Sequence, residues 1–368
     1  MSDEAGGPFD ALTLGRWPPR EHDALRAWDG ADRYLLEALD EEGIEGPILL
    51  VGDAFGALGT ALAGRATSWG DSDLSRRALE ANLQANRCPP VPWWPLTQSP
   101  SGSFAAALVR LPRSLRRLSM VAQRVAPLLA PGAVLLAGAK SKDVQQSAVR
   151  VIDGAIGPAA STLARHRARL IRAVRDGRTA PPLEERSVEI EPGLRQRAFA
   201  GVFGEEALDG GTALLLSFVT EWPGAGLIVD LGCGAGPLGL VAARRNPGAT
   251  VCFRDSSHLA VASAERAFAE AGLPNLGRFE VGDCLEGVAD HSVDVVLCNP
   301  PFHEGRVVSR RVAARMFEQS TRALRRGGRL LVVGNRHLGY GQVLRRHFAT
   351  VRALGADRRF EVWEGLRA

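Results

Sequence analysis

One order of elements occurs twice along the chain: an apolar run, a glycine-rich turn and an apolar helical segment. The two runs are residues 47–51 and 227–231, and the turns that follow them span residues 52–59 and 232–236. After each turn, further apolar runs alternate with helical patterns. Strands that alternate with helices in this way form parallel sheets, so we predict an α/β fold with a doubly wound sheet in each half.

The expected elements of the two halves correspond. In the second half we predict strands over residues 249–255, 278–283, Val293–Cys298 and 329–334, and helices over residues 238–245, His258–Ala271 and 307–325. In the first half we predict strands over residues 67–71, 104–108 and 133–138, and helices over residues 73–86 and 114–129. Short runs near residues 349–354 and 359–364 predict a closing antiparallel hairpin.

The length of 368 residues suits two domains. We place them at residues 1–180 and 190–368. The linker is expected within residues 175–192, where glycine and proline lie among charged side chains.

The first copy lacks the polar residues of the second. Aligning the glycines places Leu50 opposite Asp230 and Ala54 opposite Gly234. It also places residues 110–113 (Arg-Leu-Pro-Arg) opposite residues 299–302 (Asn-Pro-Pro-Phe). We interpret the chain as a tandem duplication of Rossmann-like domains in which the N-terminal copy is degenerate. Two unrelated α/β domains are the alternative.

Composition narrows the class of protein. Hydrophobic residues make up 45% and charged residues 23%, which is typical of a globular chain. The five cysteines form no Cys-x-x-Cys pair, so we expect a reducing compartment and neither disulfides nor a zinc site. The first residues lack the apolar core of a signal peptide, and no run of 18 apolar residues occurs. We therefore expect a soluble cytoplasmic protein that binds no membrane.

The second glycine-rich turn has the form Asp230-x-Gly232-x-Gly234-x-Gly236, with Cys233 inside it. Glycines at this position let the backbone approach a ligand closely. The spacing departs from the dinucleotide fingerprint, and an acid before the first glycine suits an ammonium group better than a pyrophosphate. We therefore predict that the turn binds the methionine part of S-adenosylmethionine. A purely structural strand-to-helix turn is the alternative.

Acidic residues also end the next two strands of this half. Asp255, followed by Ser256, is placed to accept both ribose hydroxyls of an adenosyl group. Its alternative role is the N-cap of the following helix. Asp283, together with Cys284, is placed to contact the adenine edge, and a simple turn residue is the alternative there.

The tetrapeptide Asn299-Pro300-Pro301-Phe302 directly follows the fourth apolar strand. An exocyclic base amine is a poor nucleophile because its lone pair is delocalised into the ring. The Asn299 side-chain oxygen and the Pro300 carbonyl can each accept one N–H and direct that lone pair toward a methyl donor, while the prolines hold both acceptors rigid. Phe302 can stack on the base. We predict a catalytic loop here and assign no catalytic role to His303; a stiff Pro-Pro turn is the alternative.

Basic residues gather at two places in the first half, although the net charge of the chain is only +4. Five of them are candidates for contacts with an RNA backbone: Arg110, Arg113, Arg165, Arg169 and Arg172. A solvated helix face is the alternative interpretation.

These residues resemble the class I methyltransferase superfamily, and the segments 201–203, 208–212, 299–305 and 334–340 resemble the ribosomal-RNA (guanine-N2)-methyltransferases. That family has two tandem methyltransferase-like domains, the first of them degenerate. Its members use S-adenosylmethionine without a metal and modify a guanine of ribosomal RNA. The resemblance also implies that Phe203, Asp209 and Thr212 help to form the cofactor site. In the first half, residues 55–58, 111–114 and 137–142 resemble the branch that acts on the large subunit, whereas residues 89–103 match no part of the pattern.

The resemblance thus predicts transfer of a methyl group from S-adenosylmethionine to guanine N2 in ribosomal RNA, with the large-subunit (23S) RNA favoured over the small-subunit (16S) RNA. The expected partner is ribosomal RNA or a ribosomal subunit precursor, and the chain is expected to be a monomer. Methylation of adenine N6 or of a glutamine amide is an alternative, because those enzymes also use Asn-Pro-Pro and an aromatic residue. A non-catalytic RNA-binding protein of ribosome assembly is another.

Overall fold

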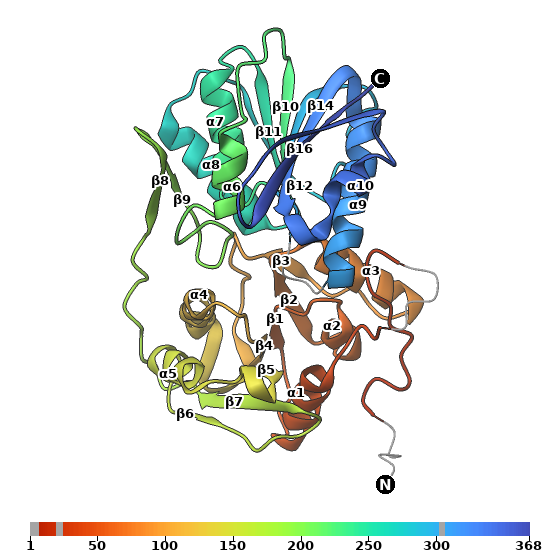
Figure 1. Ribbon diagram of the computed structural model, residues 1–368. Coiled ribbons are helices and arrows are strands. Elements are labelled where there is room, and N and C mark those ends of the chain that lie inside the picture. The colour runs from red at the N-terminus through yellow and green to blue at the C-terminus, as the bar shows by residue number, and fades with distance from the viewer. Residues whose placement is uncertain (1–6, 20–24, 302–305) are drawn as a thin grey trace. The chain divides into compact units, whose positions relative to one another are not determined.

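The computed structural model describes residues 7–19, 25–301 and 306–368, and within the last range the side chains from residue 311 onward. The chain forms two compact units, Met1–Glu184 and Glu185–Ala368 (Figure 1). The division falls inside the predicted linker. That linker is shorter than predicted, however, because Arg175 and Arg178 bond to the N-terminal unit and a strand begins at Ser187.

The N-terminal unit contains a seven-stranded sheet in the order β3-β2-β1-β4-β5-β7-β6. Its strands are β1 (Ile48–Val51), β2 (Ala66–Gly70), β3 (Trp93–Pro95), β4 (Phe104–Arg110), β5 (Leu129–Lys140), β6 (Ala159–Ser161) and β7 (Ala168–Val174). Its α-helices are α1 (Gly30–Glu41), α2 (Ala57–Ala61), α3 (Asp73–Ala85), α4 (Leu115–Val125) and α5 (Gln146–Ala155).

The C-terminal unit repeats this arrangement in the order β12-β11-β10-β13-β14-β16-β15. Its strands are β10 (Leu227–Leu231), β11 (Thr250–Asp255), β12 (Gly277–Val281), β13 (Val293–Cys298), β14 (Leu324–Asn335), β15 (Thr350–Ala356) and β16 (Phe360–Leu366). Its α-helices are α6 (Gly210–Leu216), α7 (Pro237–Arg245), α8 (His258–Ala271), α9 (Arg306–Ala323) and α10 (Tyr340–Leu344). A separate hairpin, β8 (Ser187–Glu191) and β9 (Leu194–Arg197), precedes them.

The two sheets share their topology as well as their strand count. In each sheet the first five strands of the order run parallel, and only the sixth, β7 or β16, runs against its two neighbours. This shared order supports the interpretation of the chain as a duplication. The predicted C-terminal hairpin is present as β15 and β16.

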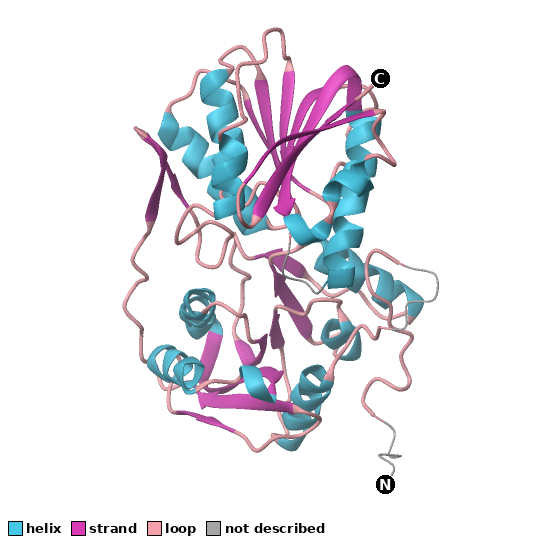
Figure 2. Ribbon diagram, viewed as in Figure 1, coloured by secondary structure: helices cyan, strands magenta, loops and turns pink. Residues whose placement is uncertain are grey.

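Helices cover both faces of the C-terminal sheet (Figure 2), and its central strands explain why. Every residue of β13 is buried. Val295 and Leu297 pack into the core on one face, whereas Val296 and Cys298 pack into the core on the other. A parallel strand that is apolar on both faces needs a helical layer on each side. Among the described helices, none is long and apolar enough to span a membrane.

Local signals account for the elements that match the sequence expectation most closely. Helix α8 has the predicted bounds because Ser257 caps its first turn and Gly272 ends it in the left-handed conformation. Strand β14 begins at Leu324, five residues earlier than predicted, and continues through the two glycines. The unmatched region 89–103 contributes the short edge strand β3, which pairs with β2.

Candidate active site

The carboxyl ends of β11, β10 and β13 bring the predicted site residues to one edge of the C-terminal sheet. Leu231 at the end of β10 lies beside Arg254 of β11 and Cys298 of β13. The glycine-rich turn therefore starts between Asp255 and Asn299, the residues that follow these two neighbours. Open parallel sheets bind ligands at this edge.

Asp230 lies beneath the glycine-rich turn. Its Oδ2 accepts a hydrogen bond from the backbone N–H of Gly239 at 2.8 Å, which holds the start of α7 against β10. Its Oδ1 is buried and has no hydrogen-bond partner among the described residues. Burial raises the pKa of Asp230 to about 8. The site thus keeps one unused carboxyl oxygen below the turn.

The glycines let the turn pack closely against its neighbours. Gly236 has a φ of 87°, and a Cβ there would lie 3.0 Å from the Cβ of Ala264. Gly234 has a φ of 53°, and a Cβ there would lie 3.1 Å from the backbone oxygen of Phe203. Phe203 is 46% exposed beside this turn. Its apolar ring is available to be covered by a ligand.

Asp255 connects the turn to the next helix. Its Oδ2 accepts from the Gly234 N–H at 3.1 Å and its Oδ1 accepts from the Ser257 N–H at 2.9 Å. The N-cap of α8 is Ser257, whose hydroxyl oxygen accepts from Ala260. The alternative role of Asp255 as the helix cap is therefore wrong. Ser256, half-buried between the two, also belongs to this edge.

Asp283 is buried two residues after β12 and pairs with Arg315, a residue that the sequence analysis missed. The Arg315 Nη1 lies 2.6 Å from the Asp283 Oδ2. One turn further along α9, the Gln319 side chain accepts from the Leu285 N–H at 2.7 Å. Cys284 between them has a φ of 48°. Helix α9 thus fixes the loop that carries the predicted adenine contacts, and no local sequence signal announces that pairing.

Asn299 is the centre of a polar cluster with α6. Its Nδ2 donates to Thr212 Oγ1 at 2.8 Å and to Asp209 Oδ2 at 3.2 Å. Because a carboxylate accepts and does not donate, these contacts set the orientation of the amide. The Asn299 Oδ1 is then left buried without a partner among the described residues. A buried acceptor without a donor is costly, so it marks a place where a ligand N–H would be stabilised.

The structure places Asp209 and Thr212 on Asn299 rather than on the glycine-rich turn. Asp209 is the N-cap of α6, and its carboxylate also accepts from the Thr212 N–H at 3.0 Å. Pro300 is buried and Pro301 is exposed. Phe302 and His303 lie outside the described residues.

In the N-terminal unit, Arg110 occupies the position equivalent to that of Asn299. The strand registers pair Leu50 with Leu108 and Asp230 with Leu297, so that Arg110 and Asn299 are two residues further along equivalent strands. The Arg110 guanidinium pairs with Asp29 at 2.8 Å and with Asp32 at 2.6 Å. These two acids occupy the same positions of α1, the N-cap and the third residue, as Asp209 and Thr212 in α6.

The consequence of this exchange is chemical. A guanidinium only donates hydrogen bonds, whereas the amide of Asn299 also accepts. In the N-terminal unit an ion pair therefore stands in place of the amide cluster, and Arg110 offers no counterpart of the Asn299 Oδ1 acceptor. The side chains at the N-cap and the third residue of α1 still contact Arg110, as those of α6 contact Asn299.

The N-terminal unit has Leu50 in place of Asp230, but another carboxylate makes the equivalent hydrogen bond. Asp53, inside the first turn, accepts from the Gly59 N–H at 2.8 Å, as Asp230 does from Gly239. Burial, together with the nearby charge of Asp32, raises the pKa of Asp53 to about 7. The sequence alignment could not show this, because Asp53 aligns with Cys233. Asp53 preserves the attachment of α2 to the sheet.

Residues 165–178 form strand β7 and its flanking segments, so the alternative of a solvated helix face is wrong. Arg169 and Arg172 lie three residues apart on the strand and point to opposite faces of the sheet. Arg165 pairs with Glu41, and Arg172 pairs with Glu42. Together with the ion pairs of Arg110, these contacts engage three of the five predicted RNA-binding arginines within the unit.

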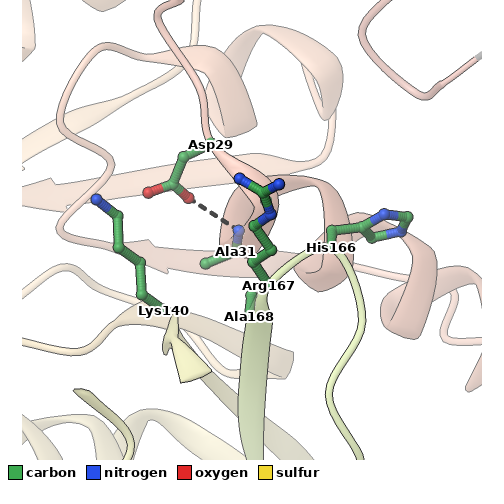
Figure 3. A pocket seen from close by; sticks show the side chains of 7 residues that line it. Asp29, Ala31, Lys140, His166, Arg167 and Ala168 are labelled. Atoms are coloured by element: carbon green, nitrogen blue, oxygen red, sulfur yellow. Dashed lines mark hydrogen bonds between the residues drawn. The ribbon is translucent and has the colours of Figure 1, made fainter. Parts of the chain in front are cut away.

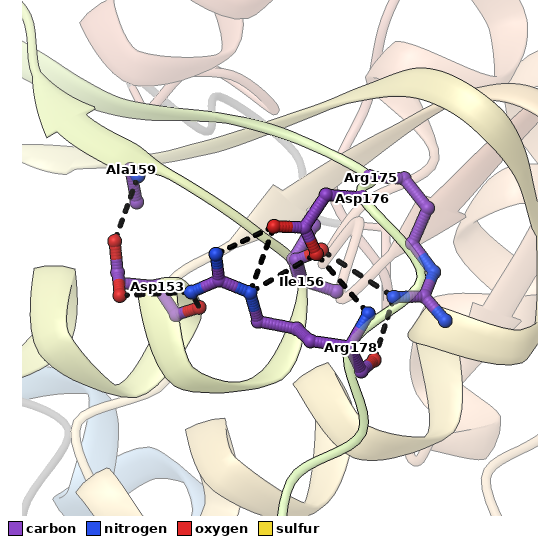
Figure 4. A network of polar contacts seen from close by, with 6 residues as sticks. All are labelled: Asp153, Ile156, Ala159, Arg175, Asp176 and Arg178. Carbon is purple, nitrogen blue, oxygen red and sulfur yellow. Dashed lines mark hydrogen bonds and ion pairs between the residues drawn. The ribbon is translucent and has the colours of Figure 1, made fainter.

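The end of this segment also stabilises the N-terminal unit itself (Figure 4). Arg178 pairs with Asp176 at 2.5 Å and with Asp153 at 3.1 Å, and Arg175 donates to the Arg178 backbone oxygen at 2.6 Å. Arg113 and Arg169 are exposed. Among the described residues, Arg169 has no ion-pair partner.

Two family models match the chain, one in each unit. The model described as "RLMG N-terminal domain" matches residues 3–177, and the one described as "Methyltransferase small domain" matches residues 194–364. The chain is similar to the ribosomal RNA large subunit methyltransferase G of Ectopseudomonas mendocina (39% identity, 96% of this chain and 97% of the relative). It is equally similar to that of Streptomyces avermitilis (39% identity, 100% of both chains).

Among solved structures, the fold matches that of a 16S rRNA N2 methyltransferase of T. thermophilus (RsmC) in complex with AdoMet and guanosine. The TM-score is 0.74 at 21% sequence identity, and the match covers 97% of this chain and 98% of the other. Both units are therefore part of the shared fold.

Proposed function

The chain belongs to the ribosomal RNA large subunit methyltransferase G family, and from that membership we propose that its C-terminal unit transfers a methyl group from S-adenosylmethionine to the exocyclic N2 amine of a guanine in large-subunit ribosomal RNA. The observation that carries this proposal is the Oδ1 of Asn299 at the carboxyl end of β13, which is buried without a partner in the part of the chain that the structure describes.

The residues at this edge fit S-adenosylmethionine. Beneath the turn, the Asp230 Oδ1, which has no partner among the described residues, is an acceptor for the ammonium group. Gly232, Gly234 and Gly236 carry no side chain that would keep a ligand from the backbone of the turn. Asp255 is half-buried at the end of β11, where it can accept from the ribose hydroxyls. Asp283, positioned by Arg315, can accept from the adenine amine. When bound, the cofactor supplies an electrophilic methyl group on a sulfonium.

The chain's own residues prepare the amine. Asn299 Oδ1 accepts one N–H, and the backbone carbonyl of Pro300 accepts the other. Both hydrogen bonds draw the lone pair out of conjugation with the base and direct it at the methyl carbon. The amine nitrogen would bond to the methyl carbon as the carbon–sulfur bond breaks and the sulfur keeps the electron pair, and the methylated amine would then lose a proton to solvent. Asp209 and Thr212 act as positioning residues, because they occupy the Asn299 Nδ2 and leave only its oxygen free.

The variant Asn299→Ala tests this role. We expect the single-turnover rate at saturating cofactor to fall on the order of 10²–10³-fold, by analogy with the removal of one preorganised hydrogen-bonding group. The affinity for S-adenosylmethionine should change little. Thr212→Val is the companion variant: it keeps the shape but lets the Asn299 amide rotate, and should lower the same rate less. A near-normal rate in Asn299→Ala would contradict the proposal.

We assign the N-terminal unit to RNA positioning. Its cluster around Arg110 has lost the acceptor that the reaction needs, which leaves binding as its contribution. Phosphate contacts of this unit would set the register of the RNA, and the C-terminal unit would select the base. The cations that are free for this purpose are those without partners inside the unit.

A further inference from the structure

A cavity of about 310 Å³ opens in the N-terminal unit (Figure 3). It lies between the first turn of α1, the end of β5 at Lys140 and the turn that leads into β7 at residues 166–168. Nothing in the proposed catalytic site accounts for it, because that site belongs to the other unit.

The side chain at this place differs in size between the two sheets. Ala168 pairs with Lys140 in the N-terminal sheet, and Phe360 pairs with Asn335 at the same place in the C-terminal sheet. There the Phe360 ring fills the space against α6, since a Cβ added to Gly210 would lie 3.1 Å from it. In the N-terminal unit the His166 backbone takes that place against α1, since a Cβ added to Gly30 would lie 2.0 Å from the His166 oxygen. The cavity lies next to it, beside the small side chain of Ala168.

The turn beside the cavity has an unusual backbone. Arg165 and Ala168 exchange backbone hydrogen bonds of 3.0 and 2.7 Å, and the two residues between them, His166 and Arg167, have φ values of 51° and 60°. This two-residue hairpin turn normally requires asparagine or glycine, because both central residues are left-handed. Two long side chains have been kept here against that preference, as is common at binding sites.

Contacts with the rest of the unit hold this turn in place. His166 Nε2 lies 2.7 Å from Glu37 Oε2, the Arg165 guanidinium lies over the Tyr34 ring, and the Arg167 carbonyl accepts from the Ser141 N–H at 2.9 Å. The Arg167 side chain takes no part in these contacts. It is presented at the cavity mouth while its neighbours hold the backbone.

Two cations at the mouth are unused. Lys140 and Arg167 are both exposed, and neither has an ion-pair or hydrogen-bond partner for its side chain among the described residues. The acid that lines the cavity, Asp29, accepts from two guanidinium nitrogens of Arg110, at 2.8 and 3.0 Å, and Arg110 also pairs with Asp32. Lys140 and Arg167 outnumber the one acid charge that Arg110 leaves unbalanced, so the net charge around the cavity is positive.

We propose that this cavity is an RNA subsite: a phosphodiester group is bound between Lys140 and Arg167, and the attached nucleotide enters the cavity beside Ala168. The inference rests on the proposed function, since it supplies the phosphate contacts of the N-terminal unit. The proposed phosphate contacts are thus made by Lys140 and Arg167, and not by Arg110, Arg165 and Arg172, which form ion pairs within the unit.

The test is the variant Arg167→Gly, with Arg87→Gly as its matched control. Arg87 is also exposed and left-handed (φ 55°), and it follows α3, which connects β2 to β3, away from the cavity. Each variant removes one positive charge and one left-handed side chain. Both should therefore raise the unfolding midpoint, by about 2–4 °C.

The two variants should differ only in their affinity for RNA and in its salt dependence. With large-subunit ribosomal RNA transcribed in vitro as the probe, filter binding at three salt concentrations should show several-fold weaker binding for Arg167→Gly and a salt slope lower by about 0.7–0.9. Arg87→Gly should match the wild type. Lys140→Ala should behave like Arg167→Gly, and Ala168→Phe should weaken binding without changing the charge.

The outcomes separate the two proposals. If the wild type methylates the RNA but Arg167→Gly binds it as Arg87→Gly does, the subsite is wrong and the proposed function stands. If the wild type neither binds nor methylates the RNA, the proposed function fails and the subsite fails with it. If Ala168→Phe does not fold, the comparison of Arg167→Gly with Arg87→Gly still tests whether the subsite binds RNA.

Discussion

Replacing Asp230 with asparagine should remove a pH dependence from the stability of the C-terminal unit. Burial raises the pKa of this carboxyl from 3.8 to about 8. Between these values the folded chain holds a proton that the unfolded chain releases. The free energy of unfolding therefore falls as pH rises through this window, by about 1.4 kcal/mol per pH unit for one proton.

The magnitude follows from this slope. Between pH 5 and pH 7 the wild type should lose about 2.7 kcal/mol from this group alone. The amide in Asp230→Asn does not titrate, yet its oxygen can still accept from the Gly239 N–H, as Asp230 Oδ2 does at 2.8 Å. Any fixed cost of the new amide is the same at both pH values. The stability of Asp230→Asn relative to the wild type should thus rise by about 2.7 kcal/mol from pH 5 to pH 7.

The assay is urea unfolding of the full chain at pH 5, 6 and 7, followed by circular dichroism. The transition of the C-terminal unit is identified as the one that S-adenosylmethionine shifts to higher urea. Asp53→Asn is the control, because burial also raises the pKa of Asp53, to about 7, but in the other unit. A stability difference between Asp230→Asn and the wild type that is equal at pH 5 and pH 7 would refute the reasoning.

Two further predictions concern the cofactor and the core. Calorimetric titration of the full chain should give one bound S-adenosylmethionine, because the N-terminal unit has Leu50 and Ala54 where the C-terminal unit has Asp230 and Gly234; two sites per chain would contradict the assignment. Gly239→Ala should destabilise the chain by about 1–3 kcal/mol in urea unfolding, because the new Cβ would lie 2.3 Å from the Phe253 ring. The control Gly248→Ala, where nothing lies within 4 Å, should stay within about 0.5 kcal/mol of the wild type.

Much of the site could be predicted from the sequence because its residues lie at the ends of parallel strands. Asp255 ends one buried strand and Asn299 directly follows another, and the carboxyl ends of neighbouring parallel strands meet at one edge. The bounds of helix α8 could also be predicted from the sequence, because its cap residues are adjacent to it in the chain. Signals of this kind lie within a few residues of the feature they specify.

The rest depends on contacts between distant residues. The pairing of Arg110 with Asp29 spans 81 positions, and that of Arg315 with Asp283 spans 32. No periodicity or motif marks such partners. The sequence therefore gives no sign that three of the five arginines predicted to contact RNA form ion pairs within the unit. Asp53 was missed for a related reason: it performs the structural role of Asp230 from a position that a gapless alignment cannot equate.

The most direct test of the central claim is mass analysis of nucleosides from large-subunit ribosomal RNA incubated with S-adenosylmethionine and the wild-type chain or Asn299→Ala. The account predicts that N2-methylguanosine appears with the wild type, at one position, and is absent with the variant. Methylation of adenine N6 instead, methylation of small-subunit RNA alone, or an equal yield of N2-methylguanosine from Asn299→Ala would contradict it.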